Sequence, residues 1–428
     1  MKKLKIALIG AGSTYSPELI EGFINKRDSL PLGELFLMDI DDRKLQIVGG
    51  LCERMIKAAK LDCQVILTKS LEDSLINADF VLAQIRVGKL PARILDEKIP
   101  LKYDLIGQET NGIGGFFKGM RTIPVILDIA SKMEQLCPNA WLINFSNPSG
   151  MICEAVLNHS NIKMLGLCNV PINMIDSVKK RLNLPNAWVE YVGLNHLTWI
   201  TAIKDGDQDY LQTAISQGLN SEAMKNIPAS GFSLDLIHTV GAIPSSYLEY
   251  YYFKDSKLQK AKEAKQTRGE VVLEIEEQLL TMYANEELHV KPELLSKRGG
   301  ARYSEVAVNL VDSIYNDKGD IQVVNTKNNG AIPFMDPNDA IEISAIIDKN
   351  GAHPIAAHFE NEHIKAYMLM MKAYEKHAVK AAILGSEEEA MRALLINPLV
   401  FDYKKAYPCF QELKEAHKEF LPQFFKGK

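Results

Sequence analysis

Four polar segments of the sequence combine amide, carboxylate and guanidinium side chains with turn-forming glycines. Hydrophobic cores seldom hold such combinations, so these segments are the first candidates for a functional site. Three of them follow predicted strands, and the carboxyl ends of parallel strands are where α/β sheets bind ligands. Their arginines and amides suit a polyhydroxylated or anionic substrate. The segments are residues 84–97, 107–115, 144–150 and 168–171.

A glycine turn near the start of the chain has the form of a dinucleotide-binding fingerprint. Gly10 and Gly12 lie between a predicted strand and a helix, where the first permits a tight turn and the second lets the backbone approach a pyrophosphate. Tyr15 replaces the third glycine, so the motif alone is a weak signal. A glycine turn in some other α/β fold is the alternative interpretation.

Asp39 ends the next predicted strand, where a carboxylate can bind a ribose 2′-hydroxyl. It follows Gly12 by 27 residues, more than the usual ~20, and a longer first helix would explain the difference. A carboxylate disfavours a 2′-phosphate, which favours NAD over NADP. The alternative is that Asp39 caps the next helix. The predicted NAD-binding residues are Gly10, Gly12, Ser13, Thr14, Asp39 and Arg86.

The elements that would position these segments are short apolar runs that alternate with amphipathic helical stretches. Strands separated by helices predict crossover connections and therefore a parallel sheet. Near-continuous apolar strands fit burial on both faces of that sheet. We predict a Rossmann-like, doubly wound α/β sheet. The predicted strands are Leu4–Ile9, Glu34–Asp39, Cys63–Leu67, Phe80–Ile85, Trp141–Phe145 and Met164–Leu167, and the first two helices are Ser16–Asn25 and Asp42–Ala59.

Helical patterns dominate beyond about residue 190, with β-like patches among them. We predict an NAD-binding domain over residues 1–190 and a mixed α+β domain for substrate binding and oligomerisation over residues 191–428. No Gly/Ser-rich or Pro-rich linker separates the halves, so they are expected to share an interface. Long apolar helices indicate a homo-oligomer, a dimer or tetramer, although periodicity does not separate interface from core.

Composition excludes several classes of protein. The 428 residues carry 49 Lys+Arg against 54 Asp+Glu, a net charge of −5, which provides no basic field for nucleic acid. No run of about 20 apolar residues is present for a membrane span, and the first apolar run is too short for a signal peptide. Six scattered cysteines lack disulfide spacing. We therefore expect a cytoplasmic enzyme with reduced thiols.

Taken together, the polar motifs resemble glycoside hydrolase family 4. Gly-Gln-Glu-Thr (107–110), Asn-Pro-Ser-Gly (147–150), Cys-Asn-Val-Pro (168–171) and Gly-Leu-Asn-His (193–196) occur in this order. Ile-Pro-Ser-Ser-Tyr-Leu (243–248) and Arg-Gly-Gly (298–300) add to the match. The resemblance covers essentially the whole chain and is far more specific than the glycine turn. Lys89, Asn111 and Ile113 depart from the family pattern but leave its chemistry in place.

The resemblance implies hydrolysis without net oxidation: NAD-dependent oxidation at C3 of the sugar, deprotonation at C2, elimination at C1, addition of water and re-reduction. Cys168 followed by Asn169 resembles the 6-phospho-β-glucosidase branch. Branches that cleave α-linked phosphoglycosides commonly carry an aspartate there as general acid, and asparagine cannot donate a proton in that way. We predict a 6-phospho-β-glucosidase that acts on phosphorylated disaccharides such as cellobiose 6-phosphate.

Three alternatives differ in class. The nearest is another family 4 glycosidase, a 6-phospho-α-glucosidase or an α-galactosidase. An NAD-dependent hydroxy-acid dehydrogenase shares the doubly wound sheet but would accumulate NADH with product. A nucleotide-sensing module is the weakest alternative, since the sequence shows no DNA-binding helix pair or basic stripe.

The resemblance also implies a metal site and a base. Cys168 and His196 would bind a divalent metal, suggested to be Mn²⁺, which holds the C2 and C3 oxygens of the sugar as a Lewis acid. Without the resemblance, a Cys and a His 28 residues apart would indicate core packing. Tyr247 would remove the C2 proton if a nearby cation lowers the pKa of its phenol. The neighbouring tyrosines 250–252 are the alternatives.

The substrate ligands implied by the resemblance are two arginines and two asparagines. Arg93 and Arg268 would bind the substrate, Arg268 particularly at the 6-phosphate, because guanidinium groups match phosphate oxygens. The alternative for Arg268 is the solvated face of a charged helix. Asn147 would bind sugar hydroxyls, and Asn169 is the fourth predicted substrate ligand. Glu109 is a candidate for orienting water or the metal's surroundings.

Overall fold

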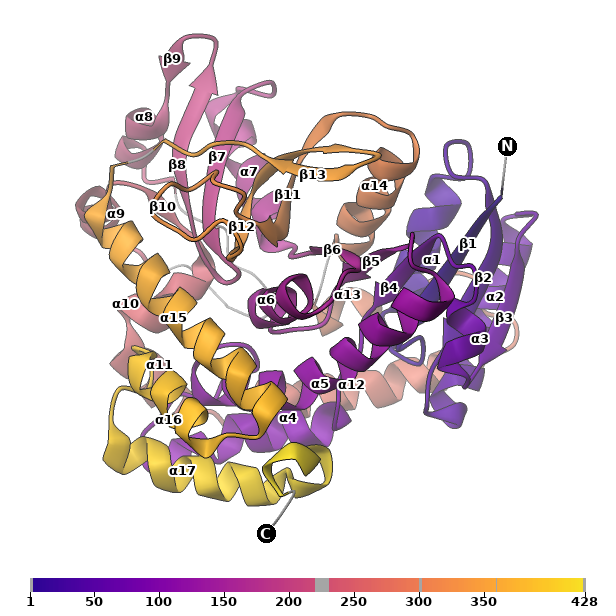
Figure 1. Cartoon of the computed structure of the whole chain (residues 1–428). Coiled ribbons are helices and arrows are strands. Elements are labelled where there is room, and N and C mark those ends of the chain that lie inside the picture. Colours follow the sequence, from indigo (N-terminus) through magenta and orange to yellow (C-terminus); the bar gives the residue numbers. More distant parts are fainter. Residues whose placement is uncertain (1–2, 220–230, 300–301, 359, 426–428) are drawn as a thin grey trace.

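The computed structural model of this chain describes residues 3–219, 231–299, 302–358 and 360–425 (Figure 1). Within these residues, 13 strands form one sheet in the order β10-β8-β7-β12-β11-β6-β5-β4-β1-β2-β3, with β13 beside β12 and β9 beside β8. The strands are β1 (Leu4–Ile9), β2 (Leu32–Met38), β3 (Gln64–Thr68), β4 (Phe80–Ala83), β5 (Trp141–Asn144), β6 (Lys163–Gly166), β7 (Trp188–Leu194), β8 (Leu197–Asp205), β9 (Gln208–Asp209), β10 (Ile243–Pro244), β11 (Asp320–Lys327), β12 (Ala340–Asp348) and β13 (Gly351–Pro354).

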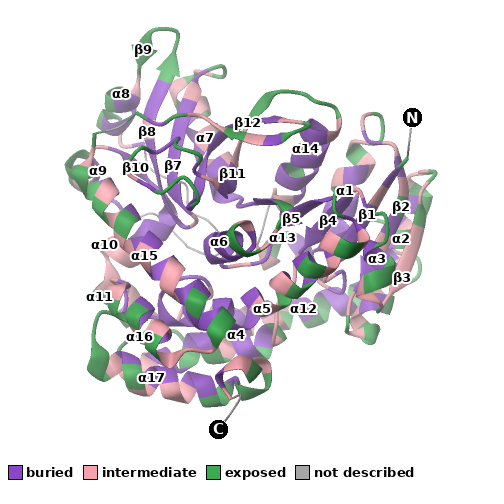
Figure 2. Ribbon diagram, viewed as in Figure 1, coloured by how far each residue is buried: buried purple, intermediate pink, exposed green. Residues whose placement is uncertain are grey.

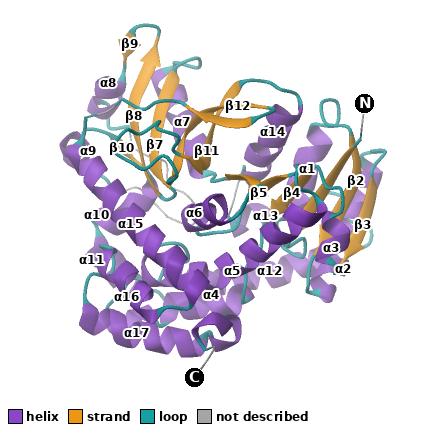
Figure 3. Ribbon diagram, viewed as in Figure 1, coloured by secondary structure: helices purple, strands orange, loops and turns teal. Residues whose placement is uncertain are grey.

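Helices surround this sheet and form the lower part of the molecule in the view of Figure 3. No helix in the described part of the chain is long and apolar enough to cross a membrane. The helices are α1 (Ser16–Asn25), α2 (Asp42–Ala58), α3 (Leu71–Leu75), α4 (Lys89–Lys98), α5 (Gly112–Leu136), α6 (Ser149–His159), α7 (Val170–Leu182), α8 (Leu211–Ser216), α9 (Leu234–Val240), α10 (Glu249–Tyr252), α11 (Lys254–Glu263), α12 (Arg268–Tyr283), α13 (Leu295–Arg298), α14 (Tyr303–Tyr315), α15 (Glu362–Leu384), α16 (Glu387–Ile396) and α17 (Tyr403–Ala416).

The first six strands are parallel and run in the order β3-β2-β1-β4-β5-β6. This is the strand order of dinucleotide-binding sheets, so the predicted Rossmann-like, doubly wound fold is confirmed. The order reverses between β1 and β4. A crevice opens at such a switch point beyond the carboxyl ends of the strands, and the glycine turn after β1 and Arg86 after β4 lie on its two sides.

The second half of the chain extends the same sheet with antiparallel strands. β11 pairs with β6 at one side and with β12 at the other, and β12 in turn pairs with β7. β7 contains residue 190, so the sheet continues through the predicted domain boundary. The division into residues 1–190 and 191–428 stays a prediction.

The residues of the parallel strands are largely buried (Figure 2), and apolar side chains cover both faces of these strands. In β1, Ile6 and Leu8 belong to one apolar cluster, whereas Ala7 and Ile9 belong to the other. Helices α1, α2, α12 and α14 contribute to the first cluster, and α5, α6, α15 and α17 contribute to the second. Two packed faces hold the strand ends rigidly, and those ends carry the candidate site.

Candidate active site

The turn after β1 approaches two neighbouring strands closely. Gly10 has a φ of +86°, and a Cβ there would lie 2.9 Å from the carbonyl oxygen of Gln84. A Cβ at Gly12 would lie 2.8 Å from Oδ2 of Asp39, an oxygen that accepts the Gly12 N–H at 2.8 Å. A side chain at either position would push these elements apart. The backbone therefore remains open at the end of the sheet, where a pyrophosphate can approach it.

The residues around this turn fit a dinucleotide. Asp39 also accepts the N–H of Asp41, yet a carboxylate has about four acceptor sites, which leaves capacity for ribose hydroxyls. Asp39 is not a helix cap, because α2 is capped by Asp41. Thr14 is fully buried, and its Oγ1 has no hydrogen-bond partner among the described residues. Ser13 Oγ accepts the backbone N–H of Tyr15 at 3.3 Å.

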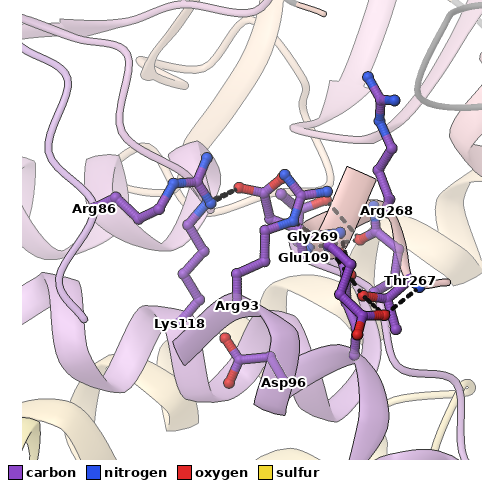
Figure 4. A network of polar contacts seen from close by, with 12 residues as sticks. Arg86, Arg93, Asp96, Glu109, Lys118, Thr267, Arg268 and Gly269 are labelled. Carbon is purple, nitrogen blue, oxygen red and sulfur yellow. Dashed lines mark hydrogen bonds and ion pairs between the residues drawn. The ribbon is translucent and has the colours of Figure 1, made fainter. Parts of the chain in front are cut away.

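Glu109 is the centre of a group of positive charges that we call the basic cluster, consisting of Glu109, Arg86, Arg93 and Lys118 (Figure 4). Arg86 pairs with Glu109. Arg93 Nη1 lies 2.7 Å from Glu109 Oε2, and Lys118 Nζ lies 2.6 Å from Oε1. Burial opposes the charge of Glu109, but the three cations outweigh it and hold its pKa well below the usual value. Glu109 is therefore ionised.

Arg93 and Arg268 lie beside the same cluster. Arg93 Nε is 2.8 Å from Oε1 of Glu97, and Oε2 of Glu97 accepts the N–H of Gly269 at 2.7 Å. This carboxylate ties the first turn of α12 to α4, and Figure 4 shows the Arg268 side chain extending away from that turn. Burial lowers the pKa of Arg268, and the charge of Arg93 lowers it further. Two guanidinium groups that repel each other favour an anion between them.

Cys168 follows β6 and lies two residues before the start of α7. The backbone N–H of Val170, the amide of Asn195 and the hydroxyl of Tyr303 are hydrogen-bonded to its sulfur. Burial raises the pKa of this thiol well above its usual value, and the negative charge of Glu342 raises it further. A neighbouring cation is what would stabilise the thiolate here.

His196 and Tyr247 stack on each other, with ring centroids 3.7 Å apart and an angle of 13° between the planes. Burial lowers the pKa of His196 to about 3, so the imidazole is neutral and able to bind a metal. Burial also raises the pKa of Tyr247 well above its usual value, and the charge of Cys168 adds to this effect. The imidazole therefore stacks on the phenol of Tyr247, and the thiol of Cys168 lies within electrostatic reach of that phenol.

The neighbouring tyrosines of Tyr247 have other partners. They belong to α10, whereas Tyr247 lies in the short turn before it. Only Tyr247, among these four, stacks on His196 in the described structure. The contacts of the others are Tyr250 with Lys257, Tyr251 with Tyr367, and Tyr252 with His363.

The predicted metal ligands Cys168 and His196 do not make a complete metal site by themselves. Among the described residues, no group of three or more His, Cys, Asp or Glu side chains could hold a metal ion. One thiolate and one neutral imidazole leave coordination positions for substrate oxygens and water, which is the arrangement of catalytic sites. The donor set therefore fits the predicted divalent metal.

The predicted substrate asparagines lie next to this pair. Oδ1 of Asn147 is buried and has no hydrogen-bond partner among the described residues, while its amide is hydrogen-bonded to Tyr303. Such an acceptor suits a sugar hydroxyl. Asn169 precedes α7, and its carbonyl oxygen accepts the amide of Asn173 at 2.8 Å. Gly300 of the Arg-Gly-Gly motif lies outside the described residues.

Three residues of this site were not predicted. Lys118 lies in the middle of α5 with 4% of its surface exposed, and burial lowers its pKa to about 7, although Glu109 opposes this. Glu342 lies within the apolar strand β12. A single charge inside an apolar run is costly to bury unless it is paired, and this signal could have identified both. Tyr303 begins a helix and carries no such signal.

Two family models match most of the chain. The model described as Family 4 glycosyl hydrolase matches residues 5–184, and the model of the Family 4 glycosyl hydrolase C-terminal domain matches residues 191–400. The chain is 46% identical to the probable 6-phospho-beta-glucosidase of Bacillus subtilis, over 99% of this chain and 98% of that protein. It is 40% identical to the 6-phospho-beta-glucosidase of Escherichia coli, over 99% and 97%.

The fold is similar to that of a solved enzyme. The 6-phospho-beta glucosidase of Thermotoga maritima, solved with NAD and glucose-6-phosphate, matches with a TM-score of 0.90 and 32% identity over 98% of this chain and 99% of that one. A second structure of that enzyme, with manganese, NAD⁺ and glucose-6-phosphate, matches with a TM-score of 0.89. The resemblance predicted from the sequence motifs is therefore confirmed.

Proposed function

The chain belongs to glycosyl hydrolase family 4, and we propose that it is a 6-phospho-β-glucosidase that uses NAD and a divalent cation, manganese. Its similarity to 6-phospho-β-glucosidases from two bacteria supports this specificity. The Thermotoga relative, solved with NAD, manganese and glucose-6-phosphate, supports the cofactors. The chain is thus a glycoside hydrolase, and the proposal concerns its substrate and its catalytic residues.

One observation carries the proposal. The two guanidinium groups of Arg93 and Arg268 lie within electrostatic reach of each other, and Arg93 is also within reach of Tyr247. A phosphate between the arginines would place a sugar against the phenol that stacks on His196. An anion-binding group and a proton-abstracting group are therefore within electrostatic reach of each other, which suits a sugar 6-phosphate.

The bound groups supply part of the chemistry. When bound, NAD supplies reversible oxidation at C3 of the sugar, and the divalent cation supplies Lewis-acid stabilisation of charge on the C2 and C3 oxygens. Gly10, Gly12, Ser13, Thr14, Asp39 and Arg86 are proposed to hold NAD, and Cys168 and His196 are proposed to hold the cation.

The side chains of the protein supply substrate binding and proton transfer. Arg93 and Arg268 bind the 6-phosphate and orient the ring, and Oδ1 of Asn147 accepts a hydrogen bond from a sugar hydroxyl. Tyr247 takes the C2 proton as general base. Asn169 has no acidic proton, which supports cleavage of β-linked rather than α-linked substrates.

Hydrolysis of nitrophenyl β-glucoside 6-phosphate tests the proposal. With NAD⁺ and Mn²⁺, the protein should release nitrophenol without net formation of NADH. The α-anomer and the unphosphorylated glucoside are the comparison substrates, and a preference for either would contradict the assignment. In heavy water, deuterium should appear at C2 of the glucose 6-phosphate product. Net NADH formation would instead favour the dehydrogenase alternative.

The proposal extends to location and assembly. We infer a cytoplasmic homo-oligomer, a dimer or tetramer. The six cysteines are all free, which suits a reducing compartment. Leu384, Phe401 and Tyr403 expose more than half of their surface, which suits a subunit interface near the C-terminal helices. Sedimentation of the purified protein tests the assembly, and a monomer would contradict it.

A further inference from the structure

The predicted metal ligand His196 lies in a strained turn. β7 and β8 are joined by two residues, Asn195 and His196, because Leu194 pairs directly with Leu197. His196 has a φ of +66°, in the left-handed region that few residues with a side chain adopt. Such a conformation costs free energy and persists only where surrounding contacts hold it. The turn therefore needs an anchor.

Glu342 provides that anchor from β12. The residue is 1% exposed, and in the sheet it lies opposite Gly193, two residues before Asn195. Its Oε1 accepts the side-chain amide of Asn195 at 3.1 Å. A buried hydrogen bond of this kind is costly to break, so it fixes the amide and the turn that carries it.

The same carboxylate is connected to the strand that leads to Cys168. Oε1 of Glu342 also accepts the side-chain amide of Asn325, at 2.9 Å. Asn325, on β11, pairs in the sheet both with Glu342 and with Gly166, the last residue of β6. Gly166 lies two residues before Cys168. One buried oxygen thus holds the two chain segments that bear the predicted metal ligands.

We propose that Glu342 is a positioning residue for the metal pair: its carboxylate orients Asn195 and, through Asn325, the end of β6, so that Cys168 and His196 face a common ion. The amide of Asn195 is itself hydrogen-bonded to the sulfur of Cys168. Groups that orient metal ligands in this way commonly change metal affinity 10- to 100-fold when removed.

A purely structural role fits Glu342 poorly. Its Oε2 is buried and has no hydrogen-bond partner among the described residues. A buried polar side chain with one unsatisfied oxygen is costly, and an apolar side chain would pack into the strand more cheaply. The polar acceptor is therefore retained at a cost, which is typical of residues that serve a site.

The inference rests on the proposed metal site, and the binding of Mn²⁺ tests both separately. Metal-free full-length protein is titrated with Mn²⁺, and the electron paramagnetic resonance signal of the free ion reports binding without any need for turnover. The dissociation constant should rise about 10- to 100-fold in Glu342→Ala. Glu342→Gln keeps a carbonyl acceptor for both amides, so it should restore the affinity to within about threefold.

Glu190→Ala is the matched control. Glu190 lies on β7, is 4% exposed and also accepts two hydrogen bonds, from Thr201 and from the backbone of His358. Its removal should lower the melting temperature about as much as Glu342→Ala does but leave Mn²⁺ affinity within about twofold. If both alanine variants weaken Mn²⁺ binding equally, the effect is general destabilisation and the inference is wrong.

Asn195→Ala tests whether Glu342 influences Mn²⁺ binding through Asn195. If Glu342 acts largely through Asn195, the double variant should bind Mn²⁺ little more weakly than Asn195→Ala alone, because the two losses are not additive. Fully additive losses, or Glu342→Gln as weak as Glu342→Ala, would overturn the positioning role. A wild-type protein that binds no Mn²⁺ would overturn the proposed function itself, whereas normal binding by Glu342→Ala would overturn only this inference.

Discussion

Two adjoining regions of the candidate site differ in whether they favour charged or neutral side chains. In the basic cluster, the attraction of three cations outweighs burial, and Glu109 is held ionised. Around Cys168, His196 and Tyr247 burial dominates, and it favours the neutral thiol, imidazole and phenol. The burial penalty acts in both regions, and the difference lies in whether opposite charges are near.

This contrast separates what each region can do. The basic cluster has more positive than negative groups, and Arg268 lies within electrostatic reach of it, so this region suits an anion. The second region has a thiol and a phenol, and a nearby cation would be needed to ionise them. A phosphate therefore suits one region and a divalent metal suits the other. The predictions below test each region in turn.

Cys168→Ser should have the largest effect, because it removes the metal ligand on which the second region depends. A Lewis-acid contribution is worth several kcal/mol, so kcat/KM for the phosphorylated β-glucoside should fall on the order of 10³-fold or more. Cys409→Ser, another buried thiol on α17, is the control and should retain most activity. Equal losses in both variants would show that the thiol of Cys168 has no special role.

Tyr247→Phe should have the next largest effect. General-base catalysis contributes about 10²-fold or more, so kcat should fall by that amount while KM changes little. Deuterium exchange at C2 in heavy water should be lost in parallel. Tyr252→Phe, which removes a hydroxyl bonded to Trp199 and His363, serves as the control. A Tyr247→Phe variant that still exchanges the C2 proton would refute the assignment.

Arg268→Gln should have a smaller effect that is confined to the phosphate. Hydrogen bonds to charged groups contribute about 1.5–3 kcal/mol, so KM should rise roughly 10- to 100-fold. The weak hydrolysis of the unphosphorylated glucoside should be unaffected. Arg392→Gln, an exposed arginine on α16, should change neither. If Arg268→Gln weakened both substrates equally, the arginine would not be the phosphate ligand.

The smallest effect expected is on the pH dependence of stability. Burial raises the pKa of Glu342 to about 7 from an ordinary value of 4.5. The folded state therefore binds this proton more tightly than the unfolded state, and metal-free protein should lose stability as the pH rises from about 4.5 to about 7. Glu342→Gln should remove that decline and change the melting temperature by a few degrees.

Glu109 should contribute with the opposite sign. Its pKa is lowered, so its ion pairs stabilise the protein above the ordinary glutamate pKa, and that stability is lost as the pH falls below it. Melting curves of metal-free wild type and Glu342→Gln between pH 4 and pH 8 measure the contribution of Glu342, because Glu109 is present in both proteins. Parallel curves for the two proteins would contradict the burial-dominated titration of Glu342.

The sequence pattern predicted the parallel strands well but not their ends. β4 was predicted to reach Ile85, yet it ends at Ala83. Beyond that point the N–H of Ile85 is bonded to the side chain of Ser146 instead of a strand. Apolar periodicity reports burial, and Ile85 is still partly buried although it lies beyond the end of the strand.

The motifs predicted candidate site residues, whose roles stay predictions, but no motif indicated how these residues are charged. The pairing of Glu109 with three cations and the stacking of Tyr247 on His196 join segments far apart in the chain. Lys118 and Glu342 were missed for the same reason. The role of each depends on partners from distant parts of the chain, which no local pattern contains.

The sequence by itself determined the alternation of strands and helices, the glycine turn and the motifs of the family, because each depends on residues close together in the chain. Only the tertiary structure decided which carboxyl groups are ionised, which are left unsatisfied, and which strand anchors the turn of His196. The physical reason is that desolvation and Coulomb attraction depend on three-dimensional distance and burial, and both are set when the chain folds.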